Sequence, residues 1–319
     1  TCEVCGGARF SPETLAVRFK DPPGSTRILQ IIHTFPDDPV ARQELVRRFK
    51  ARGFGGLTVN VSFDEYLKSE AKWQAFEAGV GAARAAGLIV WLYDEQGYPS
   101  GAAGGLVLEG HPEWEARGLL SVVRDTVIRD AVGGEPVEVP LPEGGIVSAA
   151  AYPLHGEEGS LAGAVDLLEA ARASRTLCWD RPGRWRICAL VEARLREGTH
   201  ATENLYRKRP CPNLLEAGPV ERFIELTHEA YARRFSPLSD RFEAIFTDEP
   251  SLQSVFIRES PHAALPWASG FADTFRRRKG YDIVPRLPAL VADFGPEGRR
   301  ARCGFWDVVG REAAENYFG

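Results

Sequence analysis

Two adjacent acids stand at the end of a short apolar run, in the stretch IFTDEPSL at residues 245–252. The pattern predicts a buried strand that ends on Asp248 and Glu249, with Pro250 stopping it. Two neighbouring carboxyl groups can perform general acid and base chemistry when burial or a nearby acid keeps one of them protonated. A local role is the alternative, in which Asp248 caps the following turn and Pro250 only ends the strand.

Three other predicted strands also end on polar side chains. Asp94 and Glu95 end the run LIVWLYDEQ at 88–96, His33 ends the run at 25–35, and Asn60 lies in the run at 55–63. All four residues could contact a ligand. They could equally be solvated loop acids or side chains that bond the ends of their own strands, so the alternatives stay open at this point.

The elements that would position these side chains alternate along the chain. Apolar strand patterns at 25–35, 55–63, 88–96 and 242–250 alternate with helical patterns at 38–53, 64–86 and 216–235. Strands and helices that alternate through short glycine-marked turns predict a parallel α/β sheet. Ligands bind beyond the carboxyl ends of the strands in such folds, so we expect the acids to share one edge.

The alternation breaks in the middle of the chain, which divides the sequence into four parts. Residues 1–24 form an N-terminal segment, 25–117 carry the first three strands, 118–198 read as a β-rich insertion with a short helix near 161–173, and 199–319 continue the parallel unit. A complete eight-unit barrel takes roughly 250 residues before insertions. The predicted fold is therefore a TIM-barrel-like set of β/α units that makes up about half of a barrel.

The composition is typical of a globular protein and argues against nucleic-acid and membrane partners. Of the 319 residues 44% are hydrophobic, and a net charge of −5 is spread evenly. The basic clusters at 47–50 and 275–280 fall near predicted helix ends, where cations suit the helix dipole, so no nucleic-acid surface is expected. No apolar run is long enough to span a membrane. Six scattered cysteines slightly favour the cytoplasm over other compartments, which the sequence does not determine.

Five blocks, taken together and in this order, resemble the catalytic barrel of α-L-rhamnosidase-type glycoside hydrolases. They are GFGGLTVNVSF, GLIVWLYDEQGYPSGAAGG, WDRPGRWRI, RFIELTHEAYARRF and FEAIFTDEPSL, and the resemblance covers residues 25–319. It implies a (β/α)8 barrel and hydrolysis of a glycosidic bond, such as that of an α-L-rhamnoside, with inversion. A non-catalytic carbohydrate-binding or scaffold protein is the alternative.

Carried over residue by residue, the resemblance implies that Glu249 is the general acid, beside Asp248. Asp94, Glu95 and Tyr98 would line the sugar subsite. We also expect sugar contacts from the strand-end residues His33 and Asn60 and from the ring of Trp267. No cofactor is expected, although Ca²⁺ would suit the hard carboxylate oxygens. Because half a barrel has open strand edges, self-association is expected if the barrel is incomplete.

Overall fold

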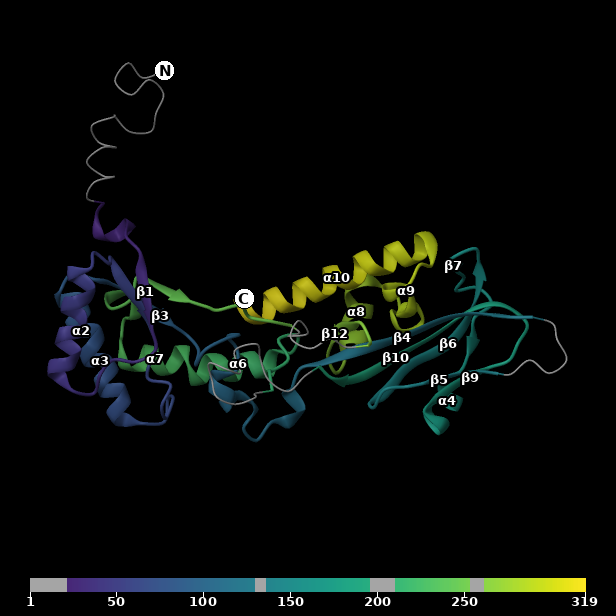
Figure 1. Cartoon of the computed structure of the whole chain (residues 1–319), viewed down its shortest axis with the longest axis horizontal. Helices are drawn as coiled ribbons and strands as arrows, with labels where there is room; N and C mark the ends of the chain where they lie inside the picture. Colours follow the sequence, from purple (N-terminus) through teal and green to yellow (C-terminus); the bar gives the residue numbers. More distant parts are fainter. Residues whose placement is uncertain (1–21, 130–135, 196–209, 253–260) are drawn as a thin grey trace, which may run out of the picture. The chain divides into compact units, whose positions relative to one another are not determined.

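A computed structural model describes residues 22–129, 136–195, 210–252 and 261–319 (Figure 1). The chain forms two compact units. Unit 1 takes the chain up to Leu106 together with Arg222–Pro250, and unit 2 takes Val107–Glu221 together with Ser251–Gly319. Most of the predicted N-terminal segment, residues 1–21, lies outside the described residues.

Unit 1 is built on a four-stranded parallel sheet. Its strands, in spatial order, are β1 (Leu29–Ile32), β2 (Gly56–Val59), β3 (Ile89–Tyr93) and β11 (Ala244–Phe246). Every neighbouring pair in this sheet is parallel. The carboxyl ends of all four strands therefore lie at one edge, as the alternation in the sequence predicts.

The helices of unit 1 begin and end where local chemistry places them. They are α2 (Pro39–Ala51), α3 (Glu70–Ala85) and α7 (His228–Arg234), while α6 (Ala217–Leu226) spans the boundary between the units. Asp38 caps α2 by accepting a hydrogen bond of 2.7 Å from the N–H of Ala41, and Pro39 occupies the first turn. Gly53 and Gly87 adopt positive φ just beyond α2 and α3, so they end these helices at no steric cost.

The core of unit 1 lies between its sheet and these helices. Phe76 of α3 packs against Tyr231 and Phe235, and the ring centroids are 5.7 and 5.6 Å apart. Leu57 and Leu92 of the two inner strands are fully buried in the same cluster. Because each such side chain stabilises the fold by roughly 1.5–3 kcal/mol, the inner strands are firmly held and their ends are fixed.

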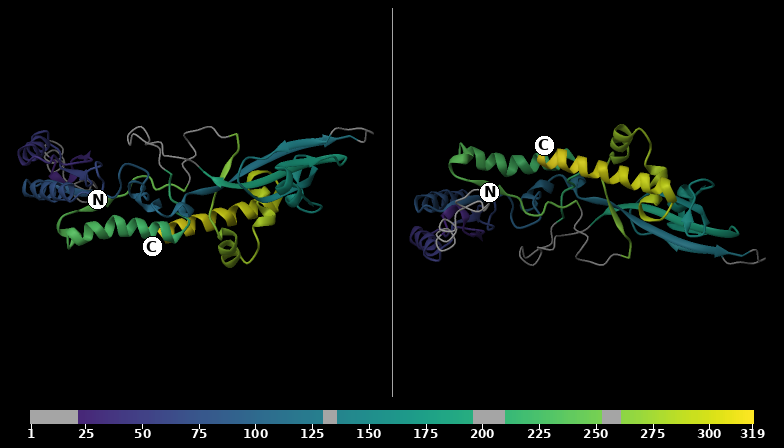
Figure 2. Two further views of the ribbon diagram at one scale, coloured as in Figure 1. Left: turned by 90° about the horizontal axis from the view of Figure 1, so that it is seen from below. Right: turned by 90° about the horizontal axis from the view of Figure 1, so that it is seen from above.

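Unit 2 is built on antiparallel strands, as the β-rich pattern after β3 predicts (Figure 2). The main sheet has the order β12 (Ala264–Trp267), β4 (Arg117–Ile128), β10 (Gly183–Arg194), β6 (Gly145–His155) and β7 (Glu158–Gly159), with β8 (Val165–Asp166) also paired to β6. A smaller sheet pairs β5 (Val137–Pro140) with β9 (Thr176–Trp179). The helices of unit 2 are α4 (Leu168–Ser174), α8 (Phe271–Lys279), α9 (Pro288–Val291) and α10 (Gly295–Phe318).

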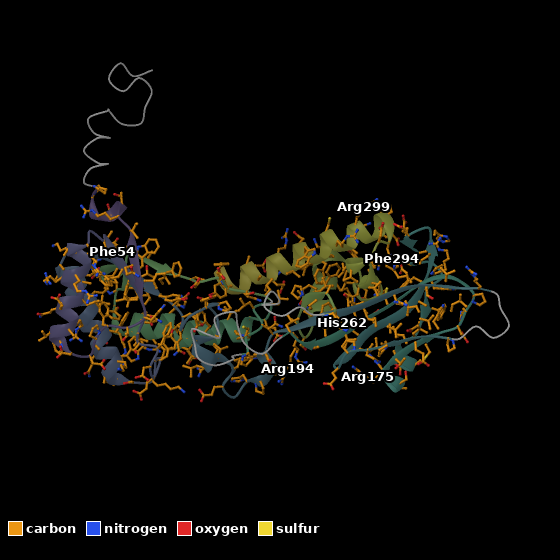
Figure 3. The ribbon with its side chains drawn as sticks, viewed as in Figure 1. Phe54, Arg175, Arg194, His262, Phe294 and Arg299 are labelled. Atoms are coloured by element: carbon orange, nitrogen blue, oxygen red, sulfur yellow. The ribbon has the colours of Figure 1, made fainter. Side chains whose placement is uncertain are left out.

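The last part of the chain differs from its predicted place. Residues 199–319 were expected to continue the parallel unit, but Ser251–Gly319 belongs to unit 2. The physical reason is burial, because Phe275 of α8 and Phe305 of α10 share a core with Leu119 and Leu190 of the antiparallel sheet. Phe294, ahead of α10, packs edge to face on Tyr152 of β6 (Figure 3). The described residues thus form a mixed α/β chain with four parallel strands and no closed barrel.

Two findings concern the predicted self-association and the predicted absence of a membrane partner. The outer strands of the parallel sheet, β1 and β11, expose Ile31 and Ile245, each to 43%. Among the described helices none is both long enough and apolar enough to cross a membrane.

Candidate active site at the ends of β3 and β11

Asp94, the first residue after β3, is buried and bonded on both carboxyl oxygens. Its exposed fraction is 0%. The Ser100 hydroxyl donates to Oδ1 over 2.6 Å, and the Thr247 hydroxyl donates to Oδ2 over 2.5 Å. Burial raises the pKa of Asp94 to about 7, against the lowering effect of the two hydroxyls and with help from the charges of Glu95 and Asp248. This carboxyl group therefore titrates near neutral pH.

Glu95 is held inside the loop that follows it, with an exposed fraction of 1%. The loop turns back on itself through positive φ at Gly101, Ala103 and Gly104, so that successive N–H groups converge in an anion nest. Five backbone N–H groups at 2.6–3.2 Å donate to the two carboxyl oxygens, from Gln96, Gly101, Ala102, Ala103 and Gly104. Glu95 therefore organises the loop and presents little surface to a ligand.

Ser100 joins the ends of the two strands. Its N–H donates to the carbonyl oxygen of Asp248 over 2.7 Å, and its Oγ accepts from the N–H of Asp248 over 2.9 Å. The same hydroxyl donates to Asp94. Ser100 thus links the block YDEQGYPSG to the block FTDEP by hydrogen bonds, although Ser100 and Asp248 are 148 positions apart in the sequence.

Asp248 and Glu249 stand nearer the surface than the first acid pair. Asp248 is half-buried, and its Oδ2 accepts a hydrogen bond of 2.7 Å from the Tyr93 hydroxyl. Glu249 is exposed and adopts φ +45°. Left-handed backbone costs a residue with a side chain about 1–2 kcal/mol, and such strain is concentrated at functional sites. The conformation thus supports a functional role for this end of β11.

His33 and Asn60 lie at the ends of β1 and β2. The exposed His33 ring stacks on Phe63 at 4.3 Å and lies 5.5 Å from the Tyr93 ring. Although the residue as a whole is exposed, its imidazole is partly desolvated, and this desolvation lowers the pKa of His33 more than Asn60 and Asp248 raise it. Asn60 is fully buried, and its Nδ2 donates to the carbonyl oxygen of Glu95 over 2.6 Å. Its Oδ1 has no hydrogen-bond partner among the described residues, which is unusual for a buried amide.

Two predicted sugar contacts lie in different surroundings. Tyr98 is half-buried in the loop that Glu95 organises. Trp267 belongs to β12 of unit 2, where its ring is 5% exposed and packs 5.1 Å from Phe271. That ring is committed to the core of unit 2, and we leave it out of the proposed site.

Several residues of the site were not predicted from the sequence. Ser100, Thr247 and Tyr93 carry the hydrogen bonds that connect the acids. A usable signal was present, because each hydroxyl lies within the same short blocks as the acids. His228 of α7 also approaches the site, with its Nε2 3.9 Å from Asp94 Oδ2.

The described part of the chain contains no cluster of side chains suited to bind a metal ion. No set of three or more His, Cys, Asp and Glu side chains is arranged to hold an ion there. The Ca²⁺ considered from the sequence therefore stays a prediction without an assigned set of ligands.

The described residues form a mixed α/β fold with acids at the carboxyl edge of four parallel strands. A solved structure with a similar fold is the rhamnosidase from Novosphingobium sp. PP1Y, at a TM-score of 0.50 and 14% sequence identity. The match covers 96% of this chain and 45% of that one, so this chain spans less than half of the rhamnosidase. At this identity the likeness supports the fold alone. No protein-family model and no curated protein matches the sequence.

Proposed function

We propose that this chain carries a glycoside hydrolase site at the carboxyl edge of its parallel sheet, with an α-L-rhamnoside as the first substrate to test. The observation that carries the proposal is the acid pair Asp248–Glu249, whose segment is linked through Ser100 and Thr247 to Asp94, a buried carboxyl group with a pKa of about 7. The α-L-rhamnoside is chosen first because a solved structure with a similar fold is a rhamnosidase.

The exposed Glu249 is assigned the role of general acid. It gives its proton to the glycosidic oxygen as the bond from that oxygen to the anomeric carbon breaks. A second carboxylate takes a proton from water, and the resulting hydroxide equivalent attacks the anomeric carbon. Asp248 is the candidate for that second role in the described residues. Its Oδ2 lies 2.7 Å from the Tyr93 hydroxyl, which orients the carboxyl group.

The sugar subsite is assigned to the residues beside this pair. The stacked rings of His33 and Phe63 offer an apolar surface for one face of a sugar. Tyr98 is placed in the same subsite from its position in the loop. Asn60 is fully buried and is placed beside this subsite from its position at the end of β2. Asp94 and Glu95 are given positioning roles, since protein groups occupy their carboxyl oxygens.

A carbohydrate-binding protein without catalysis is the second candidate. The observation that favours it is the burial of Asp94 and Glu95, at 0% and 1% exposure, which leaves Asp248 and Glu249 as the accessible acids directly after β3 and β11. Hydrolysis needs two carboxyl groups placed on opposite sides of the bond. Sugar binding needs only the subsite.

The experiment that tests the proposal measures hydrolysis of a panel of aryl glycosides that includes the α-L-rhamnoside. Glu249→Gln is expected to lower kcat by about 10² or more, as loss of a general acid does. The matched control is Glu243→Gln, an exposed acid just before β11 that pairs with Arg84 at 3.1 Å. It is expected to stay within about twofold of the unsubstituted chain.

The outcomes separate the two candidates. Activity that survives Glu249→Gln on a substrate with a poor leaving group would remove Glu249 from the mechanism. An inactive chain that binds the free sugar, measured by calorimetry, would support the binding protein instead. No hydrolysis and no binding across the panel would overturn the proposed function as a whole.

A further inference from the structure

The carboxyl group of Asp94 is placed to act on other residues rather than on a ligand. It is fully buried, and its two oxygens accept hydrogen bonds of 2.6 and 2.5 Å from Ser100 and Thr247. A backbone hydrogen bond of 3.2 Å from its own N–H to the carbonyl oxygen of Phe246 ties the same residue to the end of β11. Asp94 thus contacts β11 and the segment after it through both main chain and side chain.

The two hydroxyl residues act at consecutive points of the segment that carries the acids. Thr247 is anchored by its side chain to Asp94, and the next residue, Asp248, is bonded to Ser100 through both its N–H and its carbonyl oxygen. Glu249 follows with φ +45°. A residue with a side chain leaves this conformation readily unless its surroundings hold it there, because other conformations are about 1–2 kcal/mol more favourable.

We infer that Ser100 and Thr247 are positioning residues, which together with Asp94 form a clamp that holds the segment 247–249 and so aims Glu249 at the substrate. The inference rests on the proposed function, to which it adds these two hydroxyl side chains. The clamp has its own support, because the five N–H groups bound to Glu95 fix the loop that delivers Ser100.

The test compares substitutions that remove one hydroxyl with a substitution that keeps it. Thr247→Val preserves the volume and removes the donor to Asp94, Thr247→Ser keeps the donor, and Ser100→Ala removes the other hydroxyl. Thr58→Val is the matched control, since it makes the same change in β2 of the same sheet, at a residue that is 4% exposed, as enclosed as Ser100 at 2%. Two measurements are made on the full chain: kcat and KM for the glycoside, and hydrogen exchange of the Asp248 and Glu249 amides without sugar.

The clamp predicts a loss in kcat with little change in KM. Thr247→Val and Ser100→Ala are expected to lower kcat by about tenfold or more with KM within about twofold, because misaligned groups slow the chemical step. The Asp248 amide is expected to exchange about tenfold faster in Ser100→Ala, which removes its acceptor. Thr247→Ser is expected to recover kcat to within about threefold, and Thr58→Val to change neither measurement.

Several results would overturn the clamp. These are an unchanged Asp248 exchange rate in Ser100→Ala, a Thr247→Ser chain as impaired as Thr247→Val, or an equal loss in Thr58→Val. If the unsubstituted chain hydrolyses no glycoside, the proposed function fails. The exchange rates then still decide whether the hydroxyls hold the segment. If Thr247→Val does not fold, Ser100→Ala and Thr247→Ser carry the same comparison.

Discussion

The same dipeptide, Asp-Glu, ends two neighbouring parallel strands, and the structure treats the two copies differently. Asp94 and Glu95 are 0% and 1% exposed and bond to protein groups through all four carboxyl oxygens. Asp248 is half-buried and Glu249 is exposed. An acid at the end of a strand therefore indicates a candidate site, but it does not indicate which acid would contact the ligand.

The sequence after each pair explains the difference. Glu95 is followed by QGYPSGAAGG, whose glycines adopt the positive φ that turns five N–H groups onto one carboxylate. Glu249 is followed by Pro250, which has no N–H, and the next glycine is Gly270. Position adds to this, because β3 lies inside the described sheet and β11 at its edge. The first pair can therefore be enclosed and the second remains accessible.

The largest expected effect is on stability, from Glu95→Ala. Five backbone N–H groups lose their acceptor, at about 1 kcal/mol each, so the free energy of unfolding is expected to fall by about 5 kcal/mol. The matched change Glu249→Ala is expected to cost less than half as much, because Glu249 is exposed and its φ of +45° is as strained for alanine as for glutamate. Urea denaturation measures both. Equal losses would contradict the division into an enclosed pair and an accessible pair.

A smaller effect is expected from the pH dependence of stability. Because the folded-state pKa of Asp94 is raised from 3.8 to about 7, the folded state binds its proton more tightly than the unfolded state. The contribution of Asp94 to the free energy of unfolding therefore falls as the pH rises from about 4 to about 7, by at most about 4 kcal/mol, and is constant above this range.

Asp94→Asn removes this titration while it keeps the size of the side chain. Its stability is expected to vary less between pH 4 and pH 7 than that of the unsubstituted chain, in denaturation curves recorded at each pH. Glu243→Gln, which removes an exposed acid, is the control and should keep the original profile. An Asp94→Asn profile parallel to the original would mean that Asp94 titrates at its ordinary pKa.

Much of the fold follows from the sequence, since periodicity and glycine-marked turns place the strands and helices of unit 1. The location of Ser251–Gly319 does not follow, because an apolar helical face such as that of Phe271 and Phe275 fits any sheet with a matching surface. The acids of the site are visible in the sequence. Their environments are not, because burial and the bonds through Ser100 are made by segments 148 positions apart.

The outer position of β11 can be tested through its exposed side chain. Ile245 of β11 and Ile31 of β1 expose apolar surface on the two outer strands of the described sheet, and exposed strand edges promote association. We expect the chain to bind a hydrophobic dye and to self-associate, and Ile245→Lys to reduce the dye signal by roughly twofold. A monomer that binds no dye, measured by light scattering and fluorescence, would contradict this expectation.

The smallest expected effect is electrostatic and tests whether the two acid pairs influence each other. The negative charge of Asp248 contributes to the raised pKa of Asp94, so Asp248→Asn is expected to lower that pKa, measured by NMR titration of the Asp94 carboxyl group. Glu243→Gln should leave it in place. A pKa of Asp94 that does not fall in Asp248→Asn would mean that burial and the charge of Glu95 keep its proton without a contribution from Asp248. In that case the accessible pair would depend on the enclosed pair through hydrogen bonds, namely those of the Ser100 and Thr247 hydroxyls and the backbone bonds from Asp94 to Phe246 and from Ser100 to Asp248. The two hydroxyl substitutions would measure the side-chain part of that connection.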